Sequence, residues 1–287
     1  MGTASLSESS QELYSALNYG IFTKNGLNAS LVQINSSSQL AAALLSGSAN
    51  IAAGSGAAIA AADMKGNDLV MIGFDQVTDN GDVWASDSIK SVKDLKGKSV
   101  SATSPGSNGD LELDQLLQRN GMQASDVKHQ YLGTEAAEVA ALKSGAIQAA
   151  NLSASAASLL AGNKSFHIIA SMQGISFPYH VWAVTASYLK THQEEVTRFV
   201  AAENAALGYV HDSANAQRVD AAIADYEKVP ASSVDAARKQ NLEVKAQTLQ
   251  LPPSLVKLSF QLAVEEGAGT MPADISSFYD TSFVNSN

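Results

Sequence analysis

The chain has 287 residues, 45% of them hydrophobic, and a formal net charge of −10 at pH 7. This size and content allow a large core and two lobes, whereas the acidic balance excludes the basic surface that nucleic acids and anionic lipids require. Because cysteine is absent, thiol nucleophiles, disulfides and thiolate metal sites are excluded as well.

The N-terminal segment MGTASLSESS has neither the basic region nor the apolar stretch of a signal peptide. We expect a first strand to lead into a first helix over residues 5–14, with Ser7, Glu8 and Ser9 in the turn as candidate ligand contacts. The alternative for this turn is an ordinary helix-capping cluster.

The run at residues 40–64 is about long enough to cross a bilayer. Its Ala, Gly, Ser and Asn content makes it too weakly hydrophobic for insertion, so we expect a helix, a strand and a helix there and no membrane span.

Part of the chain is similar to another part of itself. The segment AALLSGSANIAAGS at 42–55 matches AALKSGAIQAANLS at 140–153, and each follows a polar turn and a helix start. The order of the matching pieces predicts two similar units, although alanine-rich helices that end in Ser-Gly can also look alike by chance.

Each unit alternates strands with helices, and its first helix is closed by Gly47 or Gly145. This alternation predicts an α/β fold with largely parallel sheets and helices on both faces. Ligands of such sheets bind beyond the carboxyl ends of the strands.

Strand-like runs at 69–74 and 177–185 suggest that the chain crosses between the lobes twice. We expect lobe 1 to comprise 1–82 and 188–287 and lobe 2, inserted, to comprise 83–187, with a ligand cleft between them.

The C-terminal part of the chain is expected to be helical. A long helix is predicted from about Ser187 to His211, and alanine-rich helices continue from Ala201 onward, interrupted near Val229-Pro230 and at residues 251–253.

The stretch SPGSNGD, residues 104–110, lies between a short strand and a predicted helix, where proteins hold small polar or anionic groups. It lacks the Gly-Lys-Ser/Thr ending of a phosphate-hydrolysing loop, which argues against nucleotide hydrolysis. Ser104, Ser107 and Asn108 are candidate ligand contacts, and their alternative role is to cap the helix.

Comparable turns elsewhere supply further candidates, each of which could alone be a helix cap. Aromatic side chains near the two crossings complete the predicted ligand pocket, although most single aromatics are simply core. These further candidates are Ser37, Gln39, Ser55, Gly56, Trp84, Thr134, Glu135, Ser153 and Tyr179.

No Lys or Arg occurs in the candidate loops, which makes nitrate or another bare inorganic anion a poor fit. Because Glu8, Asp75 and Glu135 are expected near the candidate loops, a neutral or partly cationic organic ligand is also compatible with the sequence. The alternative for these three carboxylates is the solvated surface.

The passage IKSVKDLKGKSVSATSPGSNGD and the two "A-L-x-x-G" stretches resemble passages of ABC-importer substrate-binding proteins of the nitrate/sulfonate/taurine type, which include binders of thiamine precursors. The resemblance runs from about Tyr14 to Trp182. Asn50 and Gln148 stand where the family usually has an acidic residue, and a proline is missing after Leu152, which weakens any transfer of ligand identity.

The resemblance implies a periplasmic binding protein of type II: two Rossmann-like lobes joined by a two-strand hinge. It also implies a periplasmic or membrane-associated location outside the cytoplasm, a leader or lipid anchor absent from this sequence, an ABC permease as partner and a small polar solute such as a sulfonate, carboxylate or heterocycle. We expect a monomer with no cofactor, no metal and no nucleic-acid partner.

The competing interpretation is an enzyme, because the same fold resembles desulfinases and pyrimidine-synthesising proteins. Such reactions call on a cysteine or a histidine cluster, and this chain has no cysteine and five histidines without ligand-type spacing. We therefore expect no catalytic residues, with His180 as a hydrogen-bonded histidine near a crossing.

Overall fold

The computed structural model forms two compact units. Unit 1 comprises Met1–Val77 and Ser176–Asn287, and unit 2 comprises Thr78–Ile175. Unit 2 is thus an insertion in the sequence of unit 1. The residues that the structure describes are 2–3, 10–34, 37–79, 81–160, 162–229 and 234–284.

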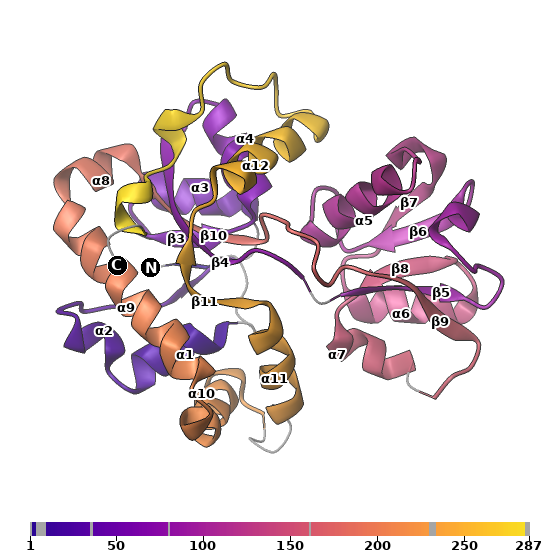
Figure 1. Ribbon diagram of the computed structural model, residues 1–287, viewed down its shortest axis with the longest axis horizontal. Helices are drawn as coiled ribbons and strands as arrows, with labels where there is room; N and C mark the ends of the chain where they lie inside the picture. Colours follow the sequence, from indigo (N-terminus) through magenta and orange to yellow (C-terminus); the bar gives the residue numbers. More distant parts are fainter. Residues whose placement is uncertain are drawn as a thin grey trace. The chain divides into compact units, whose positions relative to one another are not determined.

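Unit 1 contains one sheet and the larger number of helices (Figure 1). Its elements in chain order are β1 (Gly2–Thr3), α1 (Gln11–Asn18), α2 (Ile21–Lys24), β2 (Val32–Gln33), α3 (Ser37–Ser46), β3 (Ala52–Gly54), α4 (Gly56–Met64), β4 (Leu69–Gln76), β10 (His180–Thr185), α8 (Ala186–Thr191), α9 (Gln193–His211), α10 (Ala216–Glu227), α11 (Asp235–Val244), β11 (Lys245–Gln250) and α12 (Pro253–Glu265).

Unit 2 contains the second sheet. Its elements are β5 (Asp82–Ser86), β6 (Ser99–Ala102), α5 (Asn108–Arg119), β7 (Lys128–Tyr131), α6 (Glu135–Ser144), β8 (Ala149–Leu152), α7 (Ala154–Ala157) and β9 (Phe166–Ser171).

Among the described residues, no helix combines the length and the apolar character needed to cross a membrane.

The two sheets share a strand plan over five strands, and β11 adds a sixth strand to the sheet of unit 1. In unit 1 the order is β11-β4-β10-β3-β1-β2, and in unit 2 it is β7-β6-β8-β5-β9. Each sheet has three parallel strands (β2, β1 and β3; β7, β6 and β8), followed by one antiparallel strand, β10 or β5. In both units the carboxyl ends of three parallel strands therefore meet at one edge.

β10 marks a difference from the sequence-based boundaries. Residues 83–187 were assigned to lobe 2, but β10 pairs with β3 and β4 over its whole length and so lies in unit 1. Both neighbouring strands of β10, β3 and β4, precede unit 2 in the chain. The sequence of an apolar strand does not indicate which sheet it joins, so this long-range pairing could not be predicted.

β4 is buried on both faces, which explains why its sequence LVMIGFDQ is an almost continuous apolar run. Val70 and Ile72 pack in the core with α1, α2 and α9, whereas Leu69 and Met71 pack in the core with α3, α4 and α12. Figure 1 shows these two sets of helices on opposite sides of the sheet.

Unit 2 repeats this layering on a smaller scale. Val83 and Val100 pack in a core with α5, whereas Ala150 and Leu152 pack in a core with α6 and α7. The sheet therefore presents alternate side chains to helices on either face, as the period of two in a strand requires.

The two similar sequence segments form the same succession of elements. Residues 42–55 span the end of α3, β3 and the N-cap of α4, and residues 140–153 span the end of α6, β8 and the turn before α7. Gly47 and Gly145 follow the two helices with φ of 72° and 80°, the left-handed conformation that glycine adopts without a Cβ clash.

Gly56 allows α4 to pack closely on its neighbours. Its N–H donates to the carbonyl of Pro178 at 3.0 Å. A Cβ at this position would overlap the Ser259 hydroxyl of α12 and would lie 2.8 Å from the Pro178 Cβ. A glycine is therefore needed here for packing.

We expect Gly56→Ala to lower the free energy of unfolding by about 1–3 kcal/mol, since it overpacks this contact. Gly208→Ala is the matched control, because a Cβ at Gly208 of α9 meets nothing within 4 Å. It should stabilise the helix by about 0.5–1 kcal/mol. Urea unfolding measures both, and equal effects would contradict the packing role of Gly56.

Candidate functional site

The loops at the carboxyl ends of β6, β7 and β8 are tied together in unit 2. The N–H of Gly133, after β7, donates to the carbonyl of Thr103, after β6, at 2.9 Å. Glu135, at the start of α6, accepts from both the N–H and the hydroxyl of Ser153, after β8, at 2.7 Å each. Three of the predicted loops thus form one continuous surface.

The stretch SPGSNGD is held in shape by its own last residue. The carboxylate of Asp110 accepts from the N–H of Gly106 at 3.0 Å, and the Ser107 hydroxyl accepts from the N–H of Asp110 at 3.4 Å. Ser107 is therefore the N-cap of α5. Ser104 is exposed at the loop tip, so it is accessible to a ligand.

Asp110 also fixes two side chains of β7. Its oxygens bond the His129 Nδ1 at 2.9 Å and the Tyr131 hydroxyl at 3.3 Å. The hydrogen bond to Asp110 raises the pKa of His129, burial opposes the shift, and the nearby Asp114 adds to it. Sequence reasoning missed this histidine because its partners lie far from it in the chain.

The other predicted residues of unit 2 have different surroundings. Thr134 is the exposed N-cap of α6 and accepts from the N–H of Ala137 at 3.3 Å. Asn108 is the first residue of α5. Trp84, on β5, is half-buried against the core shared with α6 and α7, and its indole N–H is buried without a hydrogen-bond partner among the described residues.

Of the predicted residues in unit 1, Ser55 has the clearest binding character. It is the N-cap of α4, it is buried, and its hydroxyl has no partner in the part of the chain that the structure describes. Gln39 is exposed on α3, and the ring of Tyr179 meets Phe177 edge-on at 6.4 Å between centroids. Ser7, Glu8, Ser9 and the side chain of Ser37 lie outside the described residues.

A carboxyl pair lies near the start of unit 2. Glu112 of α5 is buried and its Oε2 accepts from the Asn151 amide of β8 at 3.0 Å. Burial raises the pKa of Glu112 well above its usual value, and the neighbouring Asp79 raises it further by its charge and by a hydrogen bond. Glu112 therefore keeps its proton to a higher pH than an exposed glutamate does.

The protonation of Glu112 gives the stability of unit 2 a definite pH dependence. Because the pKa of Glu112 is higher in the folded than in the unfolded chain, protonated Glu112 contributes fully to the free energy of unfolding below a pH of about 4.5. This contribution is lost as the pH rises through the pKa of the folded state. The slope reaches at most about 1.4 kcal/mol per pH unit, the effect of one proton.

We expect Glu112→Gln to remove this dependence, since a glutamine still accepts from Asn151 and can donate to Asp79. The variant should be more stable than the wild type at alkaline pH and equally stable near pH 4. Asp87→Asn, which removes an exposed carboxyl, should keep the wild-type slope. Unfolding by denaturant over a pH series measures this, and an unchanged slope in Glu112→Gln contradicts it.

Unit 1 contains a second buried charge cluster, centred on Lys245. The Nζ of Lys245 on β11 donates to the Glu12 Oε1 of α1 at 3.1 Å and to the Asp75 Oδ2 of β4 at 2.9 Å. The other oxygen of Asp75 bonds the His180 Nδ1 of β10 at 2.7 Å. The expected hydrogen bond of His180 is therefore present.

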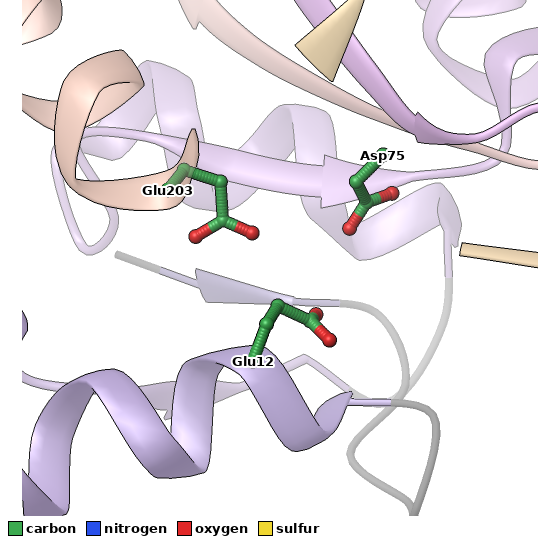
Figure 2. A group of neighbouring side chains, drawn as sticks. All are labelled: Glu12, Asp75 and Glu203. Atoms are coloured by element: carbon green, nitrogen blue, oxygen red, sulfur yellow. The ribbon is translucent and has the colours of Figure 1, made fainter. Parts of the chain in front are cut away.

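Glu203 of α9 completes this cluster. Figure 2 shows its carboxyl group turned toward those of Glu12 and Asp75. One oxygen from each of the three carboxyls can be chosen so that all lie within 4.8 Å of one another, and all three residues are buried. Oxygen atoms at this spacing are suited to a cation.

The pKa values in the cluster move in opposite directions. Burial raises the pKa of Glu12 and, together with the charges of Glu12 and Asp75, raises that of Glu203 well above its usual value. Burial also opposes ionisation of Asp75 and Lys245. The neighbouring His180 and Lys245 nevertheless lower the pKa of Asp75, and the carboxylates of Asp75 and Glu12 raise the pKa of Lys245. Asp75 and Lys245 are therefore the permanent ion pair.

Most of this cluster was missed by sequence reasoning. Glu12 looks like a first-turn helix residue, and the region after Ala201 was expected to be helical. The structure instead has β11 at residues 245–250, where KAQTLQ pairs with β4. Within β11 the buried residues are Lys245, Ala246 and Leu249, so the strand lacks the regular alternation that would have distinguished it from a helix end.

We expect Lys245→Met to lower the free energy of unfolding by about 3–5 kcal/mol, because it leaves buried carboxylates without their cation. Lys239→Met is the matched control, since Lys239 makes an exposed ion pair with Asp235 worth about 0–1 kcal/mol. Denaturant unfolding measures both. A loss in Lys245→Met no larger than in the control contradicts the role of Lys245.

Three comparisons relate this chain to known proteins. The family profile described as NMT1/THI5 like matches residues 8–217. No curated protein matches the sequence. Solved structures with a similar fold include a periplasmic aliphatic sulphonate-binding protein, SsuA, from Escherichia coli, with 20% identity, coverage of 92% of this chain and 84% of that chain, and a TM-score of 0.75.

Two further structures agree with this fold. The alkanesulfonate-binding SsuA of Xanthomonas axonopodis pv. citri, bound to MOPS, has 19% identity, coverage of 94% and 93%, and a TM-score of 0.71. The periplasmic nitrate-binding protein NrtA of Synechocystis PCC 6803 has 14% identity, coverage of 96% and 82%, and a TM-score of 0.73. The chain therefore belongs to the NMT1/THI5-like family and has the mixed α/β, two-sheet fold of periplasmic binding proteins.

Proposed function

We propose that this chain is the solute-binding component of an ABC importer, which captures a small polar organic solute outside the cytoplasm and delivers it to a membrane permease. The observation that carries the proposal is the membership of a family and fold whose solved neighbours are named as sulfonate- and nitrate-binding periplasmic proteins. In this role the chain acts as a monomer and breaks no bond in its ligand.

The binding chemistry in this proposal is that of backbone amides and hydroxyls. The tied loops of unit 2 present the exposed Ser104 beside the N-terminus of α5, and Ser55 presents an unpartnered hydroxyl at the N-terminus of α4 in unit 1. Helix N-termini carry partial positive charge and favour a sulfonate, a carboxylate or the acceptor atoms of a heterocycle.

Transport in this proposal depends on a difference between two states. A solute that contacts loops of both units stabilises the closed form of the protein over the open form by its differential contacts. The permease then distinguishes the loaded from the unloaded protein. Chemistry on the solute is not needed for this step.

The test begins with the solute itself. Native mass spectrometry of freshly purified protein identifies a co-purified small molecule, and where none is present a panel of sulfonates, carboxylates and nitrogen heterocycles is screened by calorimetry. We expect saturable binding of one solute per chain. Absence of binding across the panel, or steady turnover of the solute, would contradict the proposal.

The site is then tested with matched variants of unit 2. Ser104→Leu should raise the dissociation constant at least about tenfold, because it blocks the loop beside α5. Ser88→Leu is the control, since the exposed Ser88 follows β5, which runs antiparallel to β8, and so lies at the opposite edge of the same sheet. Equal affinities of the two variants would overturn the assignment of this edge.

A further inference from the structure

The buried cluster of unit 1 has carboxyl oxygens that its own cations do not use. Lys245 and His180 bond the Glu12 Oε1 and both oxygens of Asp75. Among the described residues, the Glu12 Oε2 is buried without a hydrogen-bond partner, and the Glu203 carboxyl is buried with the Trp182 indole N–H beside it. Glu12 and Glu203 thus carry the carboxyl oxygens that neither Lys245 nor His180 bonds.

A neutral side chain on α1 points to the same conclusion independently of the acids. Ser15 is fully buried and its hydroxyl has no partner in the described part of the chain. It lies three residues after Glu12, so the two side chains are on the same face of the helix. A buried hydroxyl without a partner costs free energy unless something else bonds it.

The charges of the cluster do not balance when its acids are ionised. Glu12, Asp75 and Glu203 then carry three negative charges against the single positive charge of Lys245. Buried charges are normally paired or coordinated, which is the condition that a bound cation would satisfy here.

We propose that Glu12, Asp75 and Glu203 bind one hard divalent cation of the Ca²⁺ or Mg²⁺ class, with the Ser15 hydroxyl as a neutral oxygen donor. The three carboxyl oxygens lie within 4.8 Å of one another, close enough to surround one ion at ordinary metal–oxygen distances. All the free donors are oxygen, the Nδ1 of His180 is bonded to Asp75, and the chain has no cysteine, so a hard cation is favoured over zinc or copper.

The ion joins three elements of unit 1. Glu12 comes from α1, Asp75 from β4 and Glu203 from α9. Apolar side chains of these elements share one core, and Lys245 bonds both Glu12 and Asp75. Binding to the folded chain alone stabilises it by mass action. The site lies within unit 1 and does not depend on the proposed solute function.

The direct test is a titration of the chelator-treated wild-type protein with Ca²⁺ and Mg²⁺ by calorimetry. We expect one site per chain with a dissociation constant of about 10⁻⁵ to 10⁻³ M. The melting temperature should rise by several degrees at saturating Ca²⁺. If the wild-type protein binds neither ion at millimolar concentration, the proposal is overturned.

Matched variants on one helix locate the ion. Glu203→Gln should weaken Ca²⁺ binding at least about tenfold, whereas Glu194→Gln, which removes an exposed carboxyl from the same helix α9, should not. Equal affinities of the two variants overturn the assignment. Should Glu203→Gln fail to fold, Ser15→Ala tests the same site without a change of charge, and wild-type affinity in Ser15→Ala removes Ser15 from it.

Terbium luminescence gives a readout of position. Trp182, next to Glu203, should sensitise Tb³⁺ bound at this site, and Ca²⁺ should displace it. Trp84, the other tryptophan, belongs to unit 2. Under excitation that is selective for tryptophan over tyrosine, Trp182→Phe should therefore remove the luminescence and retain Ca²⁺ binding. Luminescence that persists in Trp182→Phe under this excitation contradicts the location.

Discussion

Lys245 has almost no access to water, so its charge must be balanced by neighbouring side chains of unit 1. Its two carboxylate partners come from α1 and β4, and the lysine itself is on β11, at the edge of the sheet. A buried ion pair of this kind adds little net free energy compared with apolar packing, but it specifies which strand pairs with β4 and how α1 lies on the sheet.

The second constraint is the shared strand plan of the two units. Three parallel strands in each sheet end at one edge, and the loops that follow them begin helices. In unit 2 these loops are joined by the bond from Gly133 to Thr103 and by the pair of Glu135 with Ser153. The acidic side chains of Asp110 and Glu135 therefore help to hold the loops in place, while Ser104 stays exposed.

Local patterns in the sequence predicted much of this arrangement. The strand at residues 69–74, the glycines that end α3 and α6, and the family with its α/β fold were all foreseen and are confirmed. Long-range features were not: β11 depends on pairing with β4, and the helix expected over 187–211 is divided at His192 into α8 and α9. Glu203 reads as one more polar residue of a helix, because burial beside Glu12 is a property of the folded chain.

Two-dimensional NMR of the labelled chain with its solute tests the central claim, binding by loop amides and hydroxyls, most directly. We expect the amide signals of Ser104, Gly106 and Gly133 in unit 2 and of Ser55 in unit 1 to shift together, with a common dissociation constant. Shifts confined to one unit, or to residues away from these loops, would contradict it.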